Sequence, residues 1–208
     1  MRTHFYAFGS ICRGEIDFAS DVDLLACTSA PAPEIDAKKF SKYTYGRIEQ
    51  LWREGNPFAW HLHLESRLIF SSDGMDFLVG LGEPSVYKCA AADCLKFRAL
   101  FLESSNALLQ SRNSSVFNLS CMFLATRNFA TCYSFTIGRP IFSRKSPLLL
   151  AERLPISDEV FDVLARARIL STRGYGQSIS EAAIVAAKDS VPKIADWMHK
   201  LIETGELS

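Results

Sequence analysis

The sequence has no apolar run that approaches the ~20 residues needed by a membrane-spanning helix, and its first residues lack the basic, apolar and small-residue order of a secretion signal. It has six cysteines but no CxxC pair and no regular cysteine spacing, which argues against a disulfide framework and favours reduced thiols. Internal repeats and low-complexity stretches are also absent. These absences predict a globular, cytoplasmic protein that does not associate with membranes.

A strong net charge is absent as well, because 23 Lys and Arg residues balance 23 Asp and Glu residues. A protein that tracks long nucleic acid would carry a marked basic excess, so the composition argues against that class. Residues 1–87 hold 8 basic against 12 acidic side chains, and residues 88–208 hold 15 against 11. This difference suits an acidic metal-binding half followed by a basic half that helps to hold a phosphate-bearing ligand.

What the sequence does contain is a pair of carboxylates between two predicted strands near the N-terminus. Residues 4–8 and residues 22–27 both have the apolar pattern of strands. Asp21 and Asp23 are two residues apart, so on a strand they would present two carboxylates on one face. Like charges this close favour a cation between them, and Mg²⁺ prefers carboxylate, water and phosphate oxygens. The spacing therefore predicts a magnesium and nucleotide site.

Small and basic residues just before this pair supply what the phosphates of a nucleotide need. Gly9 permits close approach of the backbone, and Ser10 adds a hydroxyl at the expected start of a short helix. Arg13 can make a charge-assisted contact with a phosphate oxygen. We predict that these three residues bind the nucleotide.

These residues form an ordered motif that reads Phe8-Gly9-Ser10, then Arg13-Gly14-Glu15, then Ser20-Asp21-Val22-Asp23-Leu24-Leu25. The motif resembles that of the DNA polymerase β-like nucleotidyltransferase superfamily. It is most similar to the minimal nucleotidyltransferases of the antitoxin and aminoglycoside-modifying type. The resemblance implies an α+β protein, with a small mixed-sheet nucleotidyltransferase domain in residues 1–87 and an all-helical bundle domain in residues 88–208.

The resemblance also implies an activity and its site residues. The expected reaction transfers a nucleotidyl group, AMP from ATP, to a hydroxyl acceptor and releases pyrophosphate. Asp21 and Asp23 would bind Mg²⁺, and Gly9, Ser10, Arg13 and Ser20 would bind the nucleotide. The acceptor stays open among a protein, an RNA end and a small molecule such as an aminoglycoside, and a homodimer is also left open. The alternative is an inactive member of the superfamily that binds nucleotide or another protein.

The superfamily resemblance calls for a third carboxylate on a strand beside the motif, and Glu65 is the residue we predict. Residues 58–70 have the pattern of an extended segment, which would place His61, His63 and Glu65 on one open face. Asp76 is the other candidate, in a predicted short helix. A plainer alternative is that Glu65 pairs only with Arg67.

The remaining segments are predicted mainly as helices. Helical spacing of apolar residues covers residues 35–54, 89–110, 115–135 and 158–170, and Pro192 should break or kink the last helical region. Related helical domains of toxin ribonucleases carry an Arg that is followed within a few residues by a His. Arg127-Asn128 lies within one of these predicted helices and no His follows it, so this comparison argues against a ribonuclease. The basic loop that contains Arg139, Arg144 and Lys145 is compatible both with phosphate binding and with simple solvation.

Overall fold

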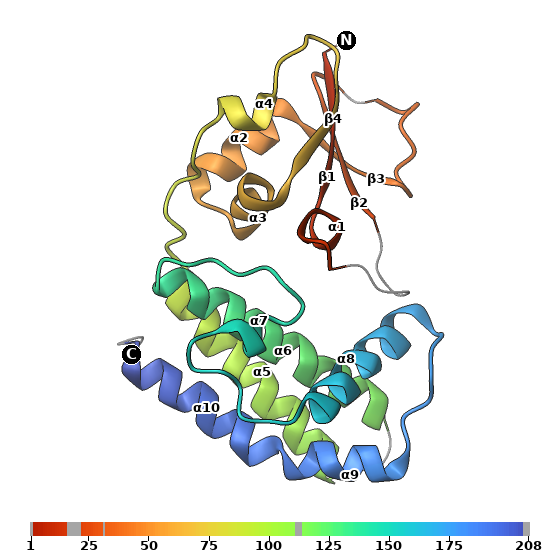
Figure 1. Ribbon diagram of the computed structural model, residues 1–208, viewed down its shortest axis with the longest axis vertical. Helices are drawn as coiled ribbons and strands as arrows, with labels where there is room; N and C mark the ends of the chain where they lie inside the picture. The colour runs from red at the N-terminus through yellow and green to blue at the C-terminus, as the bar shows by residue number, and fades with distance from the viewer. Residues whose placement is uncertain (1, 16–21, 31, 111–113, 206–208) are drawn as a thin grey trace. The chain divides into compact units, whose positions relative to one another are not determined.

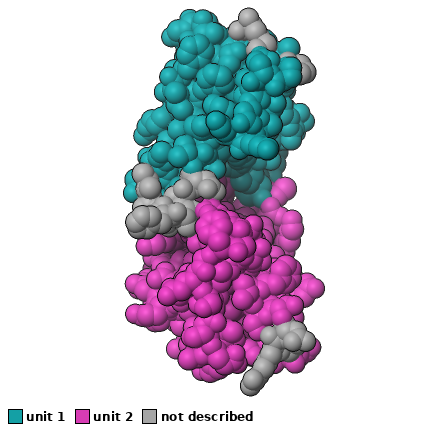
Figure 2. Space-filling model, turned by 90° about the vertical axis from the view of Figure 1, so that its right-hand side faces the viewer, with its two compact units in different colours: residues 1–88 teal, residues 89–208 magenta. Residues whose placement is uncertain are grey.

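The computed structural model describes residues 2–15, 22–30, 32–110 and 114–205. The chain divides into two compact units, Met1–Lys88 and Cys89–Ser208, which Figure 2 shows in separate colours. This division falls one residue after the predicted domain boundary. Each unit has its own cluster of buried apolar side chains, so each is described by itself.

Within the described residues, the first unit contains one four-stranded mixed sheet with the order β3-β2-β1-β4 (Figure 1). Its strands are β1 (Thr3–Phe8), β2 (Asp23–Thr28), β3 (Phe40–Thr44) and β4 (Arg67–Ser71). Strand β1 is antiparallel to both β2 and β4, and β2 is parallel to β3. The predicted strands at residues 4–8 and 22–27 are therefore confirmed.

Three helices cover one face of this sheet (Figure 1). They are α2 (Tyr45–Glu54), α3 (Pro57–Glu65) and α4 (Phe77–Gly80), and the short α1 (Ser10–Arg13) follows β1 directly. Alternate residues of β1 point into the core, so His4, Tyr6 and Phe8 are buried against the helices. The α+β class and the small mixed sheet are thus confirmed.

The predicted helix over residues 35–54 is wrong in its first half. Residues of β3 pair with β2, and the helix begins only at Tyr45. The Thr44 side chain accepts a hydrogen bond from the Arg47 backbone N–H, so Thr44 caps the helix and separates it from the strand. Aromatic residues in the strand, such as Phe40 and Tyr43, continued the helical spacing and concealed the boundary.

The predicted strand over residues 58–70 is also wrong in its first half, because residues 57–65 form α3. The Asn56 side chain accepts a hydrogen bond from the Phe58 backbone N–H, and Pro57 occupies the first turn, where its fixed φ favours a helix. The strand β4 starts only at Arg67. Alternation of apolar and polar residues in 60–65 suggested a strand. The Asn56 cap and Pro57 in the first turn favour a helix instead.

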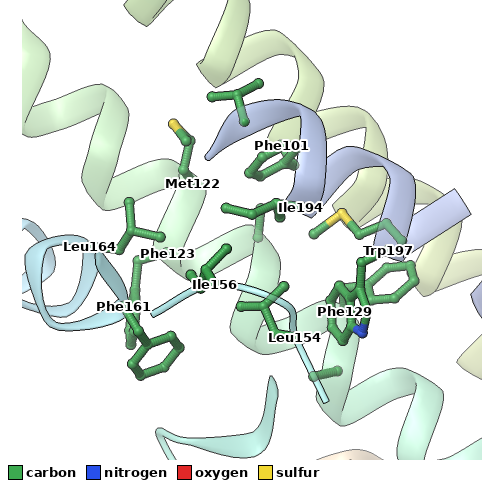
Figure 3. Close-up of a cluster of buried hydrophobic side chains, with 14 of the residues drawn as sticks. Phe101, Met122, Phe123, Phe129, Leu154, Ile156, Phe161, Leu164, Ile194 and Trp197 are labelled. Atoms are coloured by element: carbon green, nitrogen blue, oxygen red, sulfur yellow. The ribbon is translucent and has the colours of Figure 1, made fainter. Parts of the chain in front are cut away.

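The described residues of the second unit form helices and no strand. These are α5 (Ala90–Gln110), α6 (Ser115–Thr136), α7 (Ser146–Leu149), α8 (Asp158–Arg173), α9 (Glu181–Asp189) and α10 (Val191–Thr204). Figure 3 shows the core between α5, α6, α8 and α10, where Phe101, Phe129 and Trp197 are buried. Pro192 lies in the first turn of α10 and separates it from α9, as predicted. Among the described residues, no helix combines the length and apolar character required to cross a membrane.

Gly55 marks a close approach of two backbone segments within the first unit. Its φ is +65°, and a Cβ atom there would lie 2.4 Å from the carbonyl oxygens of Ser85 and Val86. Two indole N–H groups hold the same segment, since Trp52 donates to the Gly82 carbonyl and Trp60 donates to the Ser85 carbonyl, both at 2.9 Å. The chain that leaves α4 is thereby held against α2 and α3.

We predict that Gly55→Ala lowers the free energy of unfolding of the first unit by about 2 kcal/mol or more, because it adds left-handed strain and two backbone clashes. Gly46→Ala is the matched control. Gly46 lies in α2 with nothing within 4 Å of an added Cβ, so this change should raise stability by about 0.5–1 kcal/mol. Urea unfolding followed by far-UV circular dichroism measures both. Equal midpoints for the two variants would contradict the packing described above.

Candidate active site

The site starts where strand pairing brings Gly9 beside Asp23. The β1–β2 register places Phe8 opposite Asp23, so the residue after Phe8 leaves the sheet next to that carboxylate. Gly9 has φ +77° and ψ −142°, and a Cβ there would lie 2.8 Å from Asp23 Oδ2. Only glycine fits this position without displacing the carboxylate. Gly9 and Asp23 therefore lie side by side.

The chain turns from Gly9 into α1, whose first residue is Ser10, as predicted. The Cys12 N–H donates to the Gly9 carbonyl at 3.0 Å, and Gly14, with φ +73°, ends the helix. The single turn brings Arg13 back toward α3. Burial raises the pKa of the Cys12 thiol, so this cysteine stays protonated at neutral pH and is poorly suited to act as a nucleophile.

Of the predicted metal ligands, Asp23 is described and Asp21 is not. Asp23 is the first residue of β2 and has an exposed side chain. Asp21 and Ser20 lie outside the described residues, so their predicted roles stay predictions. Within the part of the chain that the structure describes, no three His, Cys, Asp or Glu residues form a group that could hold a metal ion.

Glu65 is the last residue of α3, so the strand-based reason for choosing it is wrong. Its Oε2 atom accepts a hydrogen bond from Arg13 Nη1 and lies 2.9 Å from His61 Nε2. The plainer alternative was that Glu65 pairs only with Arg67. Arg67 Nη1 donates a hydrogen bond to the Ser66 carbonyl at 2.9 Å. Glu65 thus contacts the predicted phosphate-binding arginine. His63, which the strand would have placed on the same face, lies two residues from His61 on the helix and so faces elsewhere.

Asp76, the other candidate for a third carboxylate, has a structural role. It caps α4 by accepting a hydrogen bond from the Val79 N–H, and it accepts another from the Tyr6 hydroxyl at 3.0 Å. The two strands that flank β1 and β2, namely β3 and β4, contain neither Asp nor Glu. No residue of these strands can therefore provide the expected acid.

His61 lies beside Gly9 on α3, whereas the sequence pattern placed it on a strand with His63 and Glu65. Its Cε1 atom lies 3.8 Å from the position of a Gly9 Cβ, and its ring packs edge-on against Phe8 with centroids 5.6 Å apart. The i,i+4 spacing of His61 and Glu65 would have revealed this pair once the segment was recognised as a helix.

Arg13 is the central cation of the described site. Its Nε donates to Glu15 Oε2 at 3.0 Å, while Nη1 donates to Glu65. The side chains of Arg13 and Glu65 are only 18% and 14% exposed, so solvent screens their interaction less than that of a surface pair. The site therefore combines an exposed carboxylate at Asp23 with a shielded arginine–carboxylate pair.

The sequence matches no family model, and it matches no curated protein. The resemblance to nucleotidyltransferases therefore depends on the motif residues alone and stays a prediction.

We predict that Gly9→Ala lowers the free energy of unfolding by about 2–3 kcal/mol, because the new Cβ adds a contact with Asp23 to the strain of a positive φ. Gly14→Ala is the control, since Gly14 also has a positive φ but nothing lies within 4 Å of an added Cβ. It should lose only about 1 kcal/mol. Urea midpoints measure both variants.

A second measurement isolates the contact with Asp23. In an Asp23→Ala background the carboxylate is gone, so Gly9→Ala should be less harmful than in the native chain, and only the strain of φ +77° and ψ −142° should remain. If Gly9→Ala remained as destabilising in that background as in the native chain, the close approach to the carboxylate would not be its cause.

Proposed function

We propose that this protein is a Mg²⁺-dependent nucleotidyltransferase with the architecture of the minimal nucleotidyltransferases. The observation that supports this most directly is the backbone of Gly9 beside the exposed carboxylate of Asp23, at the point where β1 leads into α1. Close backbone approach next to a carboxylate suits a ligand that carries both phosphate and a divalent cation. The substrate is an NTP, expected to be ATP, and the expected location is the cytoplasm.

The donor chemistry of the site fits Mg²⁺. Asp23 offers a carboxylate at the edge of the sheet, and Asp21 would supply the second one, so these two residues would hold the metal. Bound there, Mg²⁺ would offset the charge of the triphosphate and favour ionisation of the acceptor hydroxyl. The chain's own groups do the rest of the binding: the backbone at Gly9 and the side chains of Ser10, Ser20 and Arg13 would contact the phosphates.

The proposed reaction joins the acceptor oxygen to the α-phosphorus of the nucleotide. The bond from that phosphorus to the bridging oxygen of the β-phosphate breaks, and pyrophosphate leaves with the electron pair of that bond. The acceptor hydroxyl loses its proton to a base. The acceptor class is a hydroxyl group of a protein, an RNA end or a small molecule, because the same chemistry serves all three.

A second candidate function is nucleotide binding without transfer. The absence of a carboxylate from β3 and β4, together with the engagement of Glu65 by Arg13, favours this alternative. Incubation with labelled ATP or GTP and Mg²⁺, followed by assay of pyrophosphate, separates the two. Release of pyrophosphate that depends on Asp21 and Asp23 would exclude the binding-only function.

We predict that Asp21→Asn and Asp23→Asn each reduce nucleotidyl transfer by at least about a hundredfold, equivalent to ~3 kcal/mol of transition-state stabilisation. Each change removes a metal ligand but also removes one of two neighbouring negative charges, so the metal-free fold should be unchanged or slightly more stable. Labelled product formation and thermal unfolding measure the two effects.

Asp162→Asn is the control, because it neutralises an exposed carboxylate on α8 in the second unit. This variant should transfer at the native rate. A double Asp21→Asn, Asp23→Asn variant that kept more than about a hundredth of the native rate would refute metal catalysis at this pair.

A further inference from the structure

Two carboxylates already occupy the phosphate-binding groups of Arg13. Its Nε atom donates to Glu15, and its Nη1 atom donates to Glu65. An arginine binds a phosphate most strongly with two parallel N–H groups, in the same way that it binds a carboxylate. A phosphate that binds through either of these N–H groups therefore competes with the carboxylate that accepts from it.

Glu65 is the stronger of the two competitors. Its side chain is 14% exposed, whereas that of Glu15 is 39% exposed. Glu65 Oε2 also lies 2.9 Å from His61 Nε2, one turn earlier on α3. Glu15 follows Arg13 by two residues and moves with it, but Glu65 belongs to another element. Release of Arg13 from Glu65 therefore breaks a side-chain contact between α1 and the end of α3.

We propose that Glu65 acts as an internal substitute for phosphate, holding Arg13 in a closed state that a nucleotide must displace. This inference rests on the function proposed above and concerns the regulation of that same site. In the closed state Arg13 is paired with Glu65. In the open state Arg13 binds the triphosphate, and Glu65 keeps its contact with His61. The apparent nucleotide affinity is then lower than the intrinsic affinity by the fraction of molecules in the open state.

The same geometry separates this role from that of a metal ligand. If Glu65 were a third metal ligand, neutralising it would lower both the nucleotide affinity and the transfer rate. If Glu65 is a competing carboxylate, neutralising it would raise the nucleotide affinity, because Arg13 becomes available to the phosphate. Glu65→Gln keeps the size of the side chain and removes its charge, so the sign of its effect on binding distinguishes the two roles.

The test measures the dissociation constant of α,β-methylene-ATP with Mg²⁺ by calorimetry, using this analogue because it cannot undergo transfer. We expect Glu65→Gln to bind it about tenfold more tightly than the native chain. Arg13→Gln should bind it more weakly. In the Arg13→Gln background, Glu65→Gln should produce no gain, because the gain depends on releasing Arg13.

Glu54→Gln controls for the general loss of a negative charge in the first unit, since Glu54 is exposed at the end of α2. It should leave the dissociation constant unchanged within about twofold. Thermal unfolding checks each variant, and Glu65→Asp, which keeps the charge but shortens the side chain, provides a second test with an expected smaller gain in affinity.

Three results would overturn the inference, and they are distinguishable from one another. If the native chain binds the analogue and Glu65→Gln binds it equally or more weakly, Glu65 is not a competitor and the proposed function stands. A tenfold gain in affinity that persisted in the Arg13→Gln background would also overturn the inference. The gain would then come from the general loss of a negative charge and not from the release of Arg13. If the native chain and every variant fail to bind the analogue, both the proposed function and this inference are wrong.

Discussion

The antiparallel register between β1 and β2 is the constraint on which the candidate site depends. It places Phe8 opposite Asp23, so the chain must leave the sheet beside a carboxylate, and only glycine at position 9 permits the positive φ and the close approach. The turn of α1 then directs Arg13 toward α3, where its Nη1 donates a hydrogen bond to Glu65. A shift of one residue in this register would move Asp23 away from Gly9 and face it to the other side of the sheet.

The charges around this turn explain why a ligand of mixed charge suits the site. Asp23, Glu15 and Glu65 are acidic, and the Arg13 guanidinium pairs with two of them. Free triphosphate would be repelled by these carboxylates. Triphosphate that carries Mg²⁺ would bring positive charge, which the carboxylates attract. The arginine–carboxylate pair is mostly shielded from water, so moving Arg13 from Glu65 to a phosphate leaves the Glu65 carboxylate with only its contact to His61.

Sequence reasoning succeeded where local chemistry is decisive and failed where two patterns overlap. The first two strands, the start of α1 and the break at Pro192 were all predictable from apolar runs, the Gly-Ser pair and proline. Strand β3 and helix α3 were not, because aromatic residues in 40–52 and alternating residues in 60–65 fit either period.

The consequences of those two errors differ for the site. Missing β3 did not affect any site residue. Missing α3 hid the pairing of His61 with Glu65, because i,i+4 neighbours meet only on a helix, and it gave Glu65 a strand-based role that the structure does not support. The contact between Glu65 and Arg13 joins residues 52 positions apart, and nothing in the sequence pattern connects them.

The most direct test of the account is amide hydrogen exchange, measured by mass spectrometry with and without Mg²⁺ and α,β-methylene-ATP. The account predicts slower exchange in peptides that contain Gly9 to Arg13 and the start of β2, only when metal and nucleotide are both present. It also predicts that this protection disappears in the Asp23→Asn variant. Unchanged exchange in these peptides, or protection confined to other parts of the chain, would contradict a nucleotide site at Gly9 and Asp23.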